Sequence, residues 1–383
     1  MKNLIFTLLV GLIITGCKQE PTDSFVINGK AEGVYNGMRV YLNKVNERGG
    51  PIPIDTAIVM NETFSFQGSV AYPQLFYVNI NGTPGRLPII IENGISDLNI
   101  DSKILSYSSY TGSESYNVFK AYQKRLEDFQ KEYEKAKTNL RQSYMLNDSV
   151  RIKIDTDALN KVTKDIEDYQ YSYVEENSDN YGVLPLFYTR INSIDLDLDR
   201  ANEVYASLSE EIKATEEGNR IRTTLDRLKV VMEAEKATAI GAIAPEFSAP
   251  NPEGEIVALK DVVSKGKITM IDFWAAWCGP CRRENPNMVK VYEKYHDKGL
   301  EIIGVGLDGR RGQQNPKEAW IKAINDDKLT WHQVSNLRYF DEIAKLYNVK
   351  SIPSMLILDN EGKILSKNLR GIALERKIAE LLD

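Results

Sequence analysis

Cysteine and histidine are the scarcest reactive residues in this chain of 383 residues. The cysteines are Cys17, Cys278 and Cys281, and the histidines are His296 and His332. Once the N-terminal cysteine is set aside, at most one intramolecular bridge can form, which excludes a disulfide-stapled scaffold. Two histidines also leave little material for chemistry that depends on several imidazoles.

The chain also lacks an excess of positive charge. It has 48 Lys and Arg against 54 Asp and Glu, a net charge of −6, which argues against a nucleic-acid binder held by a general basic surface. Apolar residues make up 42% and charged residues 27%, so a disordered chain, a collagen and a polytopic membrane protein are disfavoured. At about 150 residues per domain, the length predicts two or three domains.

The first hydrophobic run, Leu4–Ile14, is too short to cross a bilayer. It has about eleven residues, where a membrane-spanning helix needs roughly 20. Together with the basic residue Lys2 in front of it, the run is typical of a signal peptide. No later segment approaches membrane length.

The next residues, Ile14-Thr15-Gly16-Cys17, resemble the bacterial lipobox, in which a small residue precedes the cysteine that receives a lipid. We expect a lipoprotein signal peptide at residues 1–16 and a lipidated tether at residues 17–24, with Cys17 as the lipidation site. The alternative is a cleaved secretory signal with a chance cysteine. The expected location is the cell envelope, anchored by lipid to the inner or outer membrane and facing the periplasm or the cell surface.

Two regions without a catalytic constellation follow. Residues 25–112 contain short apolar or alternating runs separated by turn signals such as Asn28-Gly29 and Gly49-Gly50-Pro51, which predicts an all-β sandwich or small barrel. Residues 113–236 repeat apolar side chains every three or four positions, which predicts a helical linker or bundle. Its aromatic stripe favours a core or an interface, and the segment Tyr181–Tyr188 predicts a break between helices.

Residues 237–383 alternate between strand and helix patterns. Ile268–Trp274 is an apolar run interrupted by Asp272, as expected for a central strand buried on both faces. An amphipathic helix is expected over Arg282–Tyr295. Further strands are expected at 300–307, 355–358 and 363–365, and further helices at 316–324, 340–347 and 374–382. A βαβ half joined to a ββα half is what a thioredoxin-type sheet requires.

The segment Phe273–Cys281, Phe-Trp-Ala-Ala-Trp-Cys-Gly-Pro-Cys, resembles the active site of thioredoxins. The lead-in Gly241–Phe247, together with Gly254 and Leu259, resembles the TlpA/ResA branch of exported thiol–disulfide oxidoreductases, within the wider AhpC/TSA redoxin superfamily. The resemblance covers residues 241–383. Residues 25–236 resemble the β-rich and helical extensions of such lipoproteins, whose function that similarity leaves open.

Thiol–disulfide exchange needs one accessible thiolate and one resolving thiol within bonding reach. Cys278 falls at the start of the expected helix, where free N–H groups and the helix dipole favour its anion. Cys281 follows one turn later and is expected to resolve the mixed disulfide. Gly279 and Pro280 supply a tight helix start and are expected in the substrate-binding surface.

Two carboxyl groups are candidates for proton transfer. Asp272 is a charge inside an apolar strand, which is costly unless it is paired or protonated. By resemblance it matches the buried aspartate that takes the proton from the resolving thiol, and burial should raise its pKa. Glu284 lies three residues after Cys281 on the same helical face. In the TlpA/ResA branch a glutamate at this place tunes the thiol pair; the alternative is a solvated helix residue.

Pro353 matches the cis-proline that faces the cysteine pair in this fold. The resemblance implies that it exposes the Ile352 backbone for strand-like pairing with a substrate polypeptide and that Trp277 forms one wall of the groove. The alternative is an ordinary trans proline at the start of a strand.

The sequence therefore predicts an exported, membrane-anchored thiol–disulfide oxidoreductase that reduces protein disulfides. No bound cofactor or metal is implied, because the electrons reside in the cysteine pair. The expected partners are exported proteins with disulfides, apocytochrome c among the candidates, and a membrane electron donor of the DsbD/CcdA type.

Other readings are a disulfide oxidase or isomerase, and a partner-binding surface lipoprotein with a redox-sensing module. A zinc site using both histidines is disfavoured because these lie far apart in unlike contexts. Peroxidase chemistry is disfavoured because Ile271 and Ala275 replace the residues that it requires before the cysteine.

Overall fold

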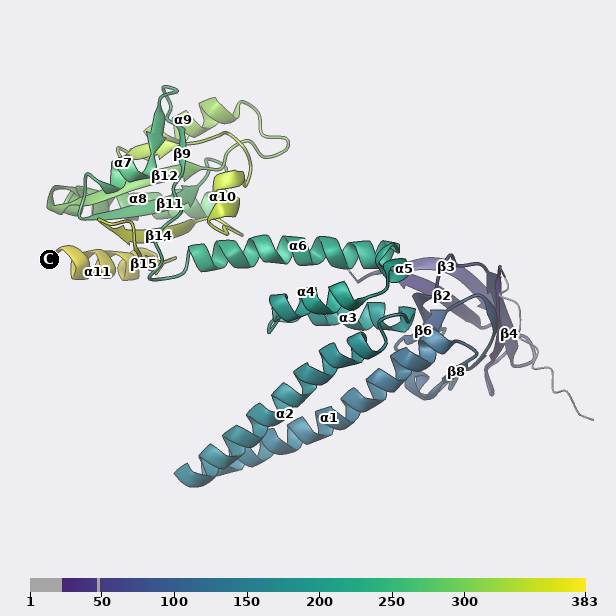
Figure 1. The fold of residues 1–383 in the computed structure, drawn as a ribbon. Coiled ribbons are helices and arrows are strands. Elements are labelled where there is room, and N and C mark those ends of the chain that lie inside the picture. Colours follow the sequence, from purple (N-terminus) through teal and green to yellow (C-terminus); the bar gives the residue numbers. More distant parts are fainter. Residues whose placement is uncertain (1–22, 47–48) are drawn as a thin grey trace, which may run out of the picture. The chain divides into compact units, whose positions relative to one another are not determined.

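A computed structural model describes residues 23–46 and 49–383, which fall into two compact units that divide between Leu225 and Asp226 (Figure 1). Helix α6 (Glu216–Ala237) begins in the first unit and ends in the second. Cys17 and the expected signal peptide lie outside the described residues. Among the residues that are described, no helix is long and apolar enough to cross a membrane.

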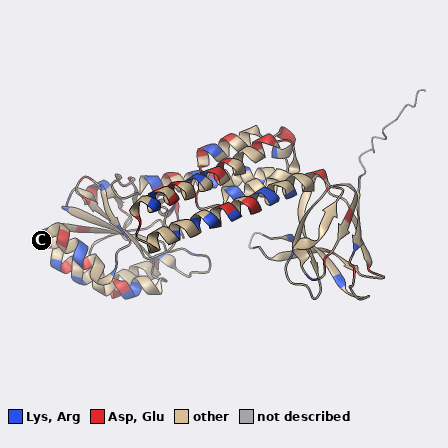
Figure 2. Cartoon of the chain, turned by 90° about the horizontal axis from the view of Figure 1, so that it is seen from below, with Lys and Arg blue, Asp and Glu red and all other residues tan. Residues whose placement is uncertain are grey.

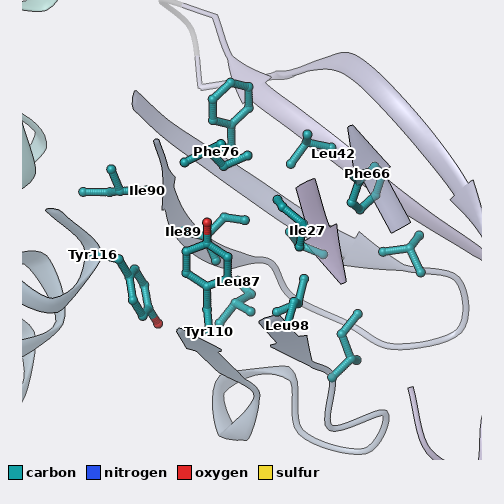
Figure 3. Packing of buried hydrophobic residues seen from close by; sticks show 14 of the residues in the cluster. Ile27, Leu42, Phe66, Phe76, Leu87, Ile89, Ile90, Leu98, Tyr110 and Tyr116 are labelled. Carbon is teal, nitrogen blue, oxygen red and sulfur yellow. The ribbon is translucent and has the colours of Figure 1, made fainter. Parts of the chain in front are cut away.

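The first unit opens with two four-stranded sheets, ordered β4–β1–β7–β8 and β3–β2–β5–β6. Their strands are β1 (Phe25–Lys30), β2 (Arg39–Val45), β3 (Pro51–Ile58), β4 (Thr63–Gly68), β5 (Gln74–Ile80), β6 (Leu87–Ile91), β7 (Gly94–Asn99) and β8 (Ser109–Thr111). Both sheets contribute to one core, as Figure 3 shows for Ile27 and Leu98 of one sheet and Leu42 and Ile89 of the other. The expected all-β region is therefore a sandwich.

Of the two turn signals named above, Gly49-Gly50 is confirmed: Gly49 has a φ of +78° and donates its N–H to the Asn46 carbonyl between β2 and β3. The other proved wrong. Asn28 and Gly29 lie within β1, where the ring of Phe64 comes within 2.3 Å of the place that a Cβ on Gly29 would occupy, so only glycine fits. Pro51 is the first residue of β3, a strand that the sequence pattern missed. This strand pairs only with β2 and is exposed along nearly its whole length. An edge strand tolerates prolines because it has fewer ladder hydrogen bonds to make.

The rest of the first unit is helical, as predicted. Helices α1 (Glu114–Met145) and α2 (Ser149–Glu176) form a long antiparallel hairpin, and α3 (Leu184–Ile191), α4 (Leu198–Ser207) and α5 (Glu210–Lys213) precede α6 (Figure 1). Lys, Arg, Asp and Glu residues recur along these helices (Figure 2). The aromatic stripe packs internally, with the Tyr122 ring 5.5 Å from that of Tyr169 and 5.4 Å from that of Tyr173.

The predicted break at Tyr181–Tyr188 is only partly correct. A 3-10 turn covers Tyr181–Val183, but helix α3 then starts at Leu184 with Pro185 in its first turn. A proline is tolerated there because the first N–H groups of a helix have no acceptor within the helix. The apolar segment therefore holds a short buried helix.

The second unit has a five-stranded sheet of order β13–β12–β11–β14–β15. Its strands are β11 (Ile268–Trp274), β12 (Leu300–Gly306), β13 (His332–Val334), β14 (Ser354–Asp359) and β15 (Ile364–Lys367), preceded by the hairpin of β9 (Ser248–Pro250) and β10 (Ile256–Ala258). The helices are α7 (Leu259–Val263), α8 (Gly279–Tyr295), α9 (Pro316–Asp326), α10 (Glu342–Leu346) and α11 (Gly371–Leu382). Strand β11 runs parallel to β12 and antiparallel to β14, which confirms the predicted thioredoxin-type arrangement.

Strand β11 fixes the position of the cysteine pair. Every one of its residues is buried, since helices cover both faces of the sheet. Met270 and Trp274 pack toward α8, where Met288 and Val291 complete that layer. The chain leaves the carboxyl end of β11 and turns directly into α8. The two cysteines therefore lie at the carboxyl end of the central strand of the sheet. Strand β13 was not predicted, because three residues are too few to show a period.

Candidate active site

Cys278 and Cys281 are joined by a disulfide, with their Cα atoms 5.3 Å apart. Cys278 is the N-cap of α8, and its Sγ accepts a hydrogen bond from the backbone N–H of Cys281 at 3.2 Å. Both cysteines are buried in this oxidised state, whereas Gly279 and Pro280 between them are exposed. The free N–H groups at the start of α8 would also stabilise a thiolate on Cys278 after reduction.

Asp272 lies on the face of β11 that packs against α8, between Met270 and Trp274 in the strand's alternation. Its side chain is buried, and its Oδ1 has no hydrogen-bond partner within the described chain. The pKa of Asp272 is raised to about 7, mainly by burial and also by the nearby Glu284 carboxylate, while Arg370 opposes the shift. The group can therefore take up or release a proton near neutral pH.

Glu284 is half-buried and ties two helices together. Its Oε1 accepts hydrogen bonds from the backbone N–H of Gly371, at the start of α11, and from Nδ2 of Asn287, both at 2.8 Å. It is thus not a freely solvated helix residue. The two carboxyl groups differ in environment: Glu284 accepts two hydrogen bonds at the surface of α8, while Asp272 is buried in an apolar layer.

The peptide bond between Ile352 and Pro353 is cis. Pro353 immediately precedes β14, whose Ser354 pairs with Phe273 near the carboxyl end of β11. Pro353 therefore lies at the same end of the sheet as the cysteines. Nη2 of Arg370 donates a hydrogen bond to the Pro353 carbonyl at 2.5 Å. Within the described chain, nothing bonds to the backbone N–H or C=O of Ile352, which leaves both groups available to a bound polypeptide.

Trp277 is half-buried beside the cysteines and contacts two residues from distant loops. The ring of Tyr339 lies 5.7 Å from its ring, and Cζ of Arg310 lies 4.9 Å from its centre. A third, Asp308, accepts a hydrogen bond from the Ala276 N–H at 3.0 Å. These residues come from the loops before α9 and α10. No spacing motif marks them, because they reach the site only through the order of the strands.

The two histidines lie apart from the cysteines. Nδ1 of His296 is 3.7 Å from one carboxylate oxygen of Glu301, and Nε2 of His332 is 4.0 Å from the other. The three residues line a surface cavity of about 460 Å³. In the part of the chain that the structure describes, no three His, Cys, Asp or Glu side chains gather to hold a metal ion. A zinc site of the Cys₂His₂ type would need Cys278 and Cys281 next to both histidines, but the histidines lie around Glu301 instead.

A thioredoxin-like sheet that presents a Cys-Gly-Pro-Cys turn at the start of its first long helix, above a buried aspartic acid, defines a thiol–disulfide oxidoreductase. The AhpC/TSA family profile matches residues 240–367, and a domain of unknown function (DUF4369) matches residues 25–119. The chain belongs to the thiol-disulfide oxidoreductase family of the ResA proteins.

The relatives match the second unit. The thiol-disulfide oxidoreductase ResA of Bacillus thuringiensis subsp. konkukian is 32% identical over 151 residues, 39% of this chain and 79% of that protein. The thioredoxin-like protein YneN of Bacillus subtilis is 32% identical over 143 residues, 37% and 78% of the two chains. A solved thioredoxin domain of a thiol-disulfide oxidoreductase from Bacteroides vulgatus has 37% identity and a TM-score of 0.34, and the match covers 38% of this chain and 99% of that one.

Proposed function

We propose that the protein reduces disulfide bonds in exported polypeptides from a lipid anchor in the cell envelope. The proposal rests on one observation: the protein has both a Cys278–Cys281 disulfide and, in the strand that leads to it, a buried Asp272 whose pKa is raised to about 7. The Gly-Pro dipeptide between the cysteines is that of thioredoxin, whose potential of about −270 mV makes it a reductant. An oxidase would run the same exchange in the opposite direction, and an isomerase would rearrange substrate disulfides without net transfer of electrons.

In the proposed reaction, the Cys278 thiolate attacks one sulfur of a substrate disulfide and displaces the other sulfur as a thiolate. Asp272 takes the proton from the Cys281 thiol, and the Cys281 sulfur then attacks Cys278 in the mixed disulfide. The substrate leaves with both sulfurs reduced, while the enzyme retains the disulfide of the described structure. Two electrons have passed from the cysteine pair to the substrate.

Pro353 and Trp277 would hold the substrate during these steps. An extended polypeptide can pair with the free backbone groups of Ile352, as a strand adds to a sheet edge. The Arg370 bond to the Pro353 carbonyl fixes the loop from the other side. Gly279 and Pro280, between the two cysteines, are exposed, so this part of the turn can contact a bound polypeptide.

Reductase activity should appear in the detergent-solubilised full chain. With dithiothreitol as reductant, the protein should accelerate the precipitation of insulin B chain, because Cys278 is the better nucleophile at neutral pH. In cells that lack a DsbD/CcdA-type membrane donor, acid-trapped protein should accumulate in the Cys278–Cys281 disulfide form. No acceleration in vitro, or a pair that stays reduced without the donor, would contradict the direction or the donor respectively.

Attachment through Cys17 is a separate proposal that rests on the lipobox-like sequence alone. Cells grown with a labelled fatty acid should incorporate the label into the wild-type protein and not into Cys17→Ala, which should leave the membrane fraction. A matched variant, Cys278→Ala, removes a different thiol and should keep the label. Equal labelling of Cys17→Ala and wild type would refute the anchor.

A further inference from the structure

Two loops, residues 308–313 before α9 and 335–341 before α10, form the wall of the active site beside Trp277. The first loop is tied to the turn that precedes the cysteines. Asp308 accepts the Ala276 N–H at 3.0 Å, Gln313 Nε2 donates to Asp308 at 2.6 Å, and Gln313 Oε1 accepts the Gly309 N–H at 2.8 Å. Burial raises the pKa of Asp308, although these hydrogen bonds oppose the effect. The loop is therefore positioned by bonds in its interior, and its tip is left exposed.

The second loop packs tightly on the first and presents aromatic rings. A Cβ on Gly309 would lie 2.1 Å from the Leu337 carbonyl oxygen, so the loops approach more closely than any other residue would allow. Leu337 and Phe340 have φ values of +54° and +45°, a conformation that is costly for bulky side chains. Tyr339, 52% exposed between them, is thereby held against Trp277.

Four arginines surround this surface, and we call them the arginine rim: Arg283, Arg310, Arg338 and Arg370. All four are exposed. Arg310 lies over the Trp277 ring, Arg370 bonds to the carbonyl of the cis-proline, and Nη1 of Arg283 lies 3.5 Å from the place that a Cβ on Gly279 would take. Within the described residues, none of the four forms a salt bridge with a carboxylate, unlike the neighbouring Arg282, which pairs with Asp327.

The carboxylates of the same loops are already engaged. Asp308 is buried and bonded to Ala276 and Gln313. Asp341 is buried and caps α10 through the N–H groups of Ile343 and Ala344. The exposed charged side chains within the two loops are therefore all positive, in a chain whose net charge is −6. The exposed carboxylate that follows the second loop, Glu342, accepts a hydrogen bond from Asn336 at 3.2 Å. Although Arg310 and Arg370 also make the contacts given above, an exposed cationic patch whose arginines form no salt bridge among the described residues is available to bind an anionic one.

We propose that the arginine rim selects disulfides flanked by acidic residues, so that the substrate class is an exported polypeptide with Asp or Glu beside its cysteines. This inference rests on the proposed reductase function. The substrate backbone would pair at Ile352, and its carboxylates would meet the rim. Clustered charge of one sign raises association rates about 10- to 1,000-fold at low ionic strength, and salt screens the effect. The electron transfer is unchanged.

The test uses the pre-reduced full chain and three synthetic peptides with the same internal disulfide, flanked by Glu, Gln or Lys. The second-order rate constant of thiol release is measured for each. The Glu peptide should react about tenfold faster than the Lys peptide at low salt, with the Gln peptide between them. At about 0.5 M NaCl the three rates should converge. Equal rates at low salt would overturn the rim proposal, while reduction of the Gln peptide would still support the reductase.

Two charge reversals and one matched control locate the effect. Arg310→Glu and Arg338→Glu should each lower the Glu-to-Lys rate ratio about threefold; Arg338 has no contact with the Trp277 ring, so its effect is one of charge. Lys363→Glu makes the same charge change in the turn after Asp359, which pairs with Ile268 at the opposite end of β11 from the cysteines. It should keep the wild-type ratio. An equal effect in all three variants would refute local recognition, and failure to reduce any peptide would refute the reductase itself.

Discussion

Replacing Cys278 with serine should lower the rate of insulin reduction at least about a thousandfold, equivalent to about 4 kcal/mol in activation free energy. The thiolate is the attacking group, and an alcohol at this position is not ionised at neutral pH. The substitution should leave the fold intact. Cys278 is the N-cap of α8, and serine is among the preferred N-cap residues, so its hydroxyl can accept the Cys281 N–H in place of the sulfur.

The matched variant is Cys281→Ser, which removes the other sulfur. This protein should still attack substrate but should stop at the mixed disulfide, because nothing displaces the substrate from Cys278. Mass spectrometry of the mixture should therefore find a one-to-one covalent adduct with Cys281→Ser and none with Cys278→Ser. Adducts on Cys278→Ser instead would reverse the two roles, and wild-type activity in Cys278→Ser would refute the enzymatic mechanism. Used in cells, the trapping variant would identify the substrates.

Asp272→Asn should slow resolution of the mixed disulfide about a hundredfold at pH 7, within the usual range for loss of a general base. The wild-type resolution rate should rise through about pH 7, because Asp272 can accept a proton only after losing its own. The asparagine variant should lose this rise. With a chromogenic aromatic disulfide, stopped-flow absorbance shows two phases, attack and resolution. Only the second phase should slow; equal slowing of both would indicate a structural defect.

Glu284→Gln provides the companion test. It keeps an oxygen for the Gly371 N–H but removes the charge that raises the pKa of Asp272. The midpoint of the resolution profile should therefore move to lower pH, with the rate at high pH little changed. A loss of the profile like that of Asp272→Asn would make Glu284 the acid–base group instead.

The same raised pKa has a consequence for stability. In the unfolded chain Asp272 should titrate near its ordinary value of 3.8, so between there and about pH 7 the folded state holds a proton that the unfolded state has lost. This group therefore makes the free energy of unfolding fall as pH rises, by about 1.4 kcal/mol per pH unit at most. Denaturant curves of oxidised wild type and Asp272→Asn should diverge over this range. Parallel curves would contradict the raised pKa.

The largest elements of the fold could be predicted because their signals are local. Strand β11 matched its predicted bounds, since a nearly continuous apolar run after Lys265-Gly266-Lys267 needs no distant information. The cysteine turn followed from its own spacing. Residues that lack such a signal escaped prediction: β13 is too short to show a period, and the prolines of β3 resemble a turn until the strand is seen at an exposed edge.

The sequence by itself determined the class of chemistry, since a Cys-Gly-Pro-Cys turn between a buried strand and a helix has few other uses. It also marked Asp272 as costly and Pro353 as special. Only the tertiary structure decided their surroundings: Glu284 bonds to a helix that starts 87 positions later, and Arg310 reaches Trp277 from another loop. A pKa or a charged rim depends on distances through space, and these are set by the order of strands in the sheet rather than by any local pattern.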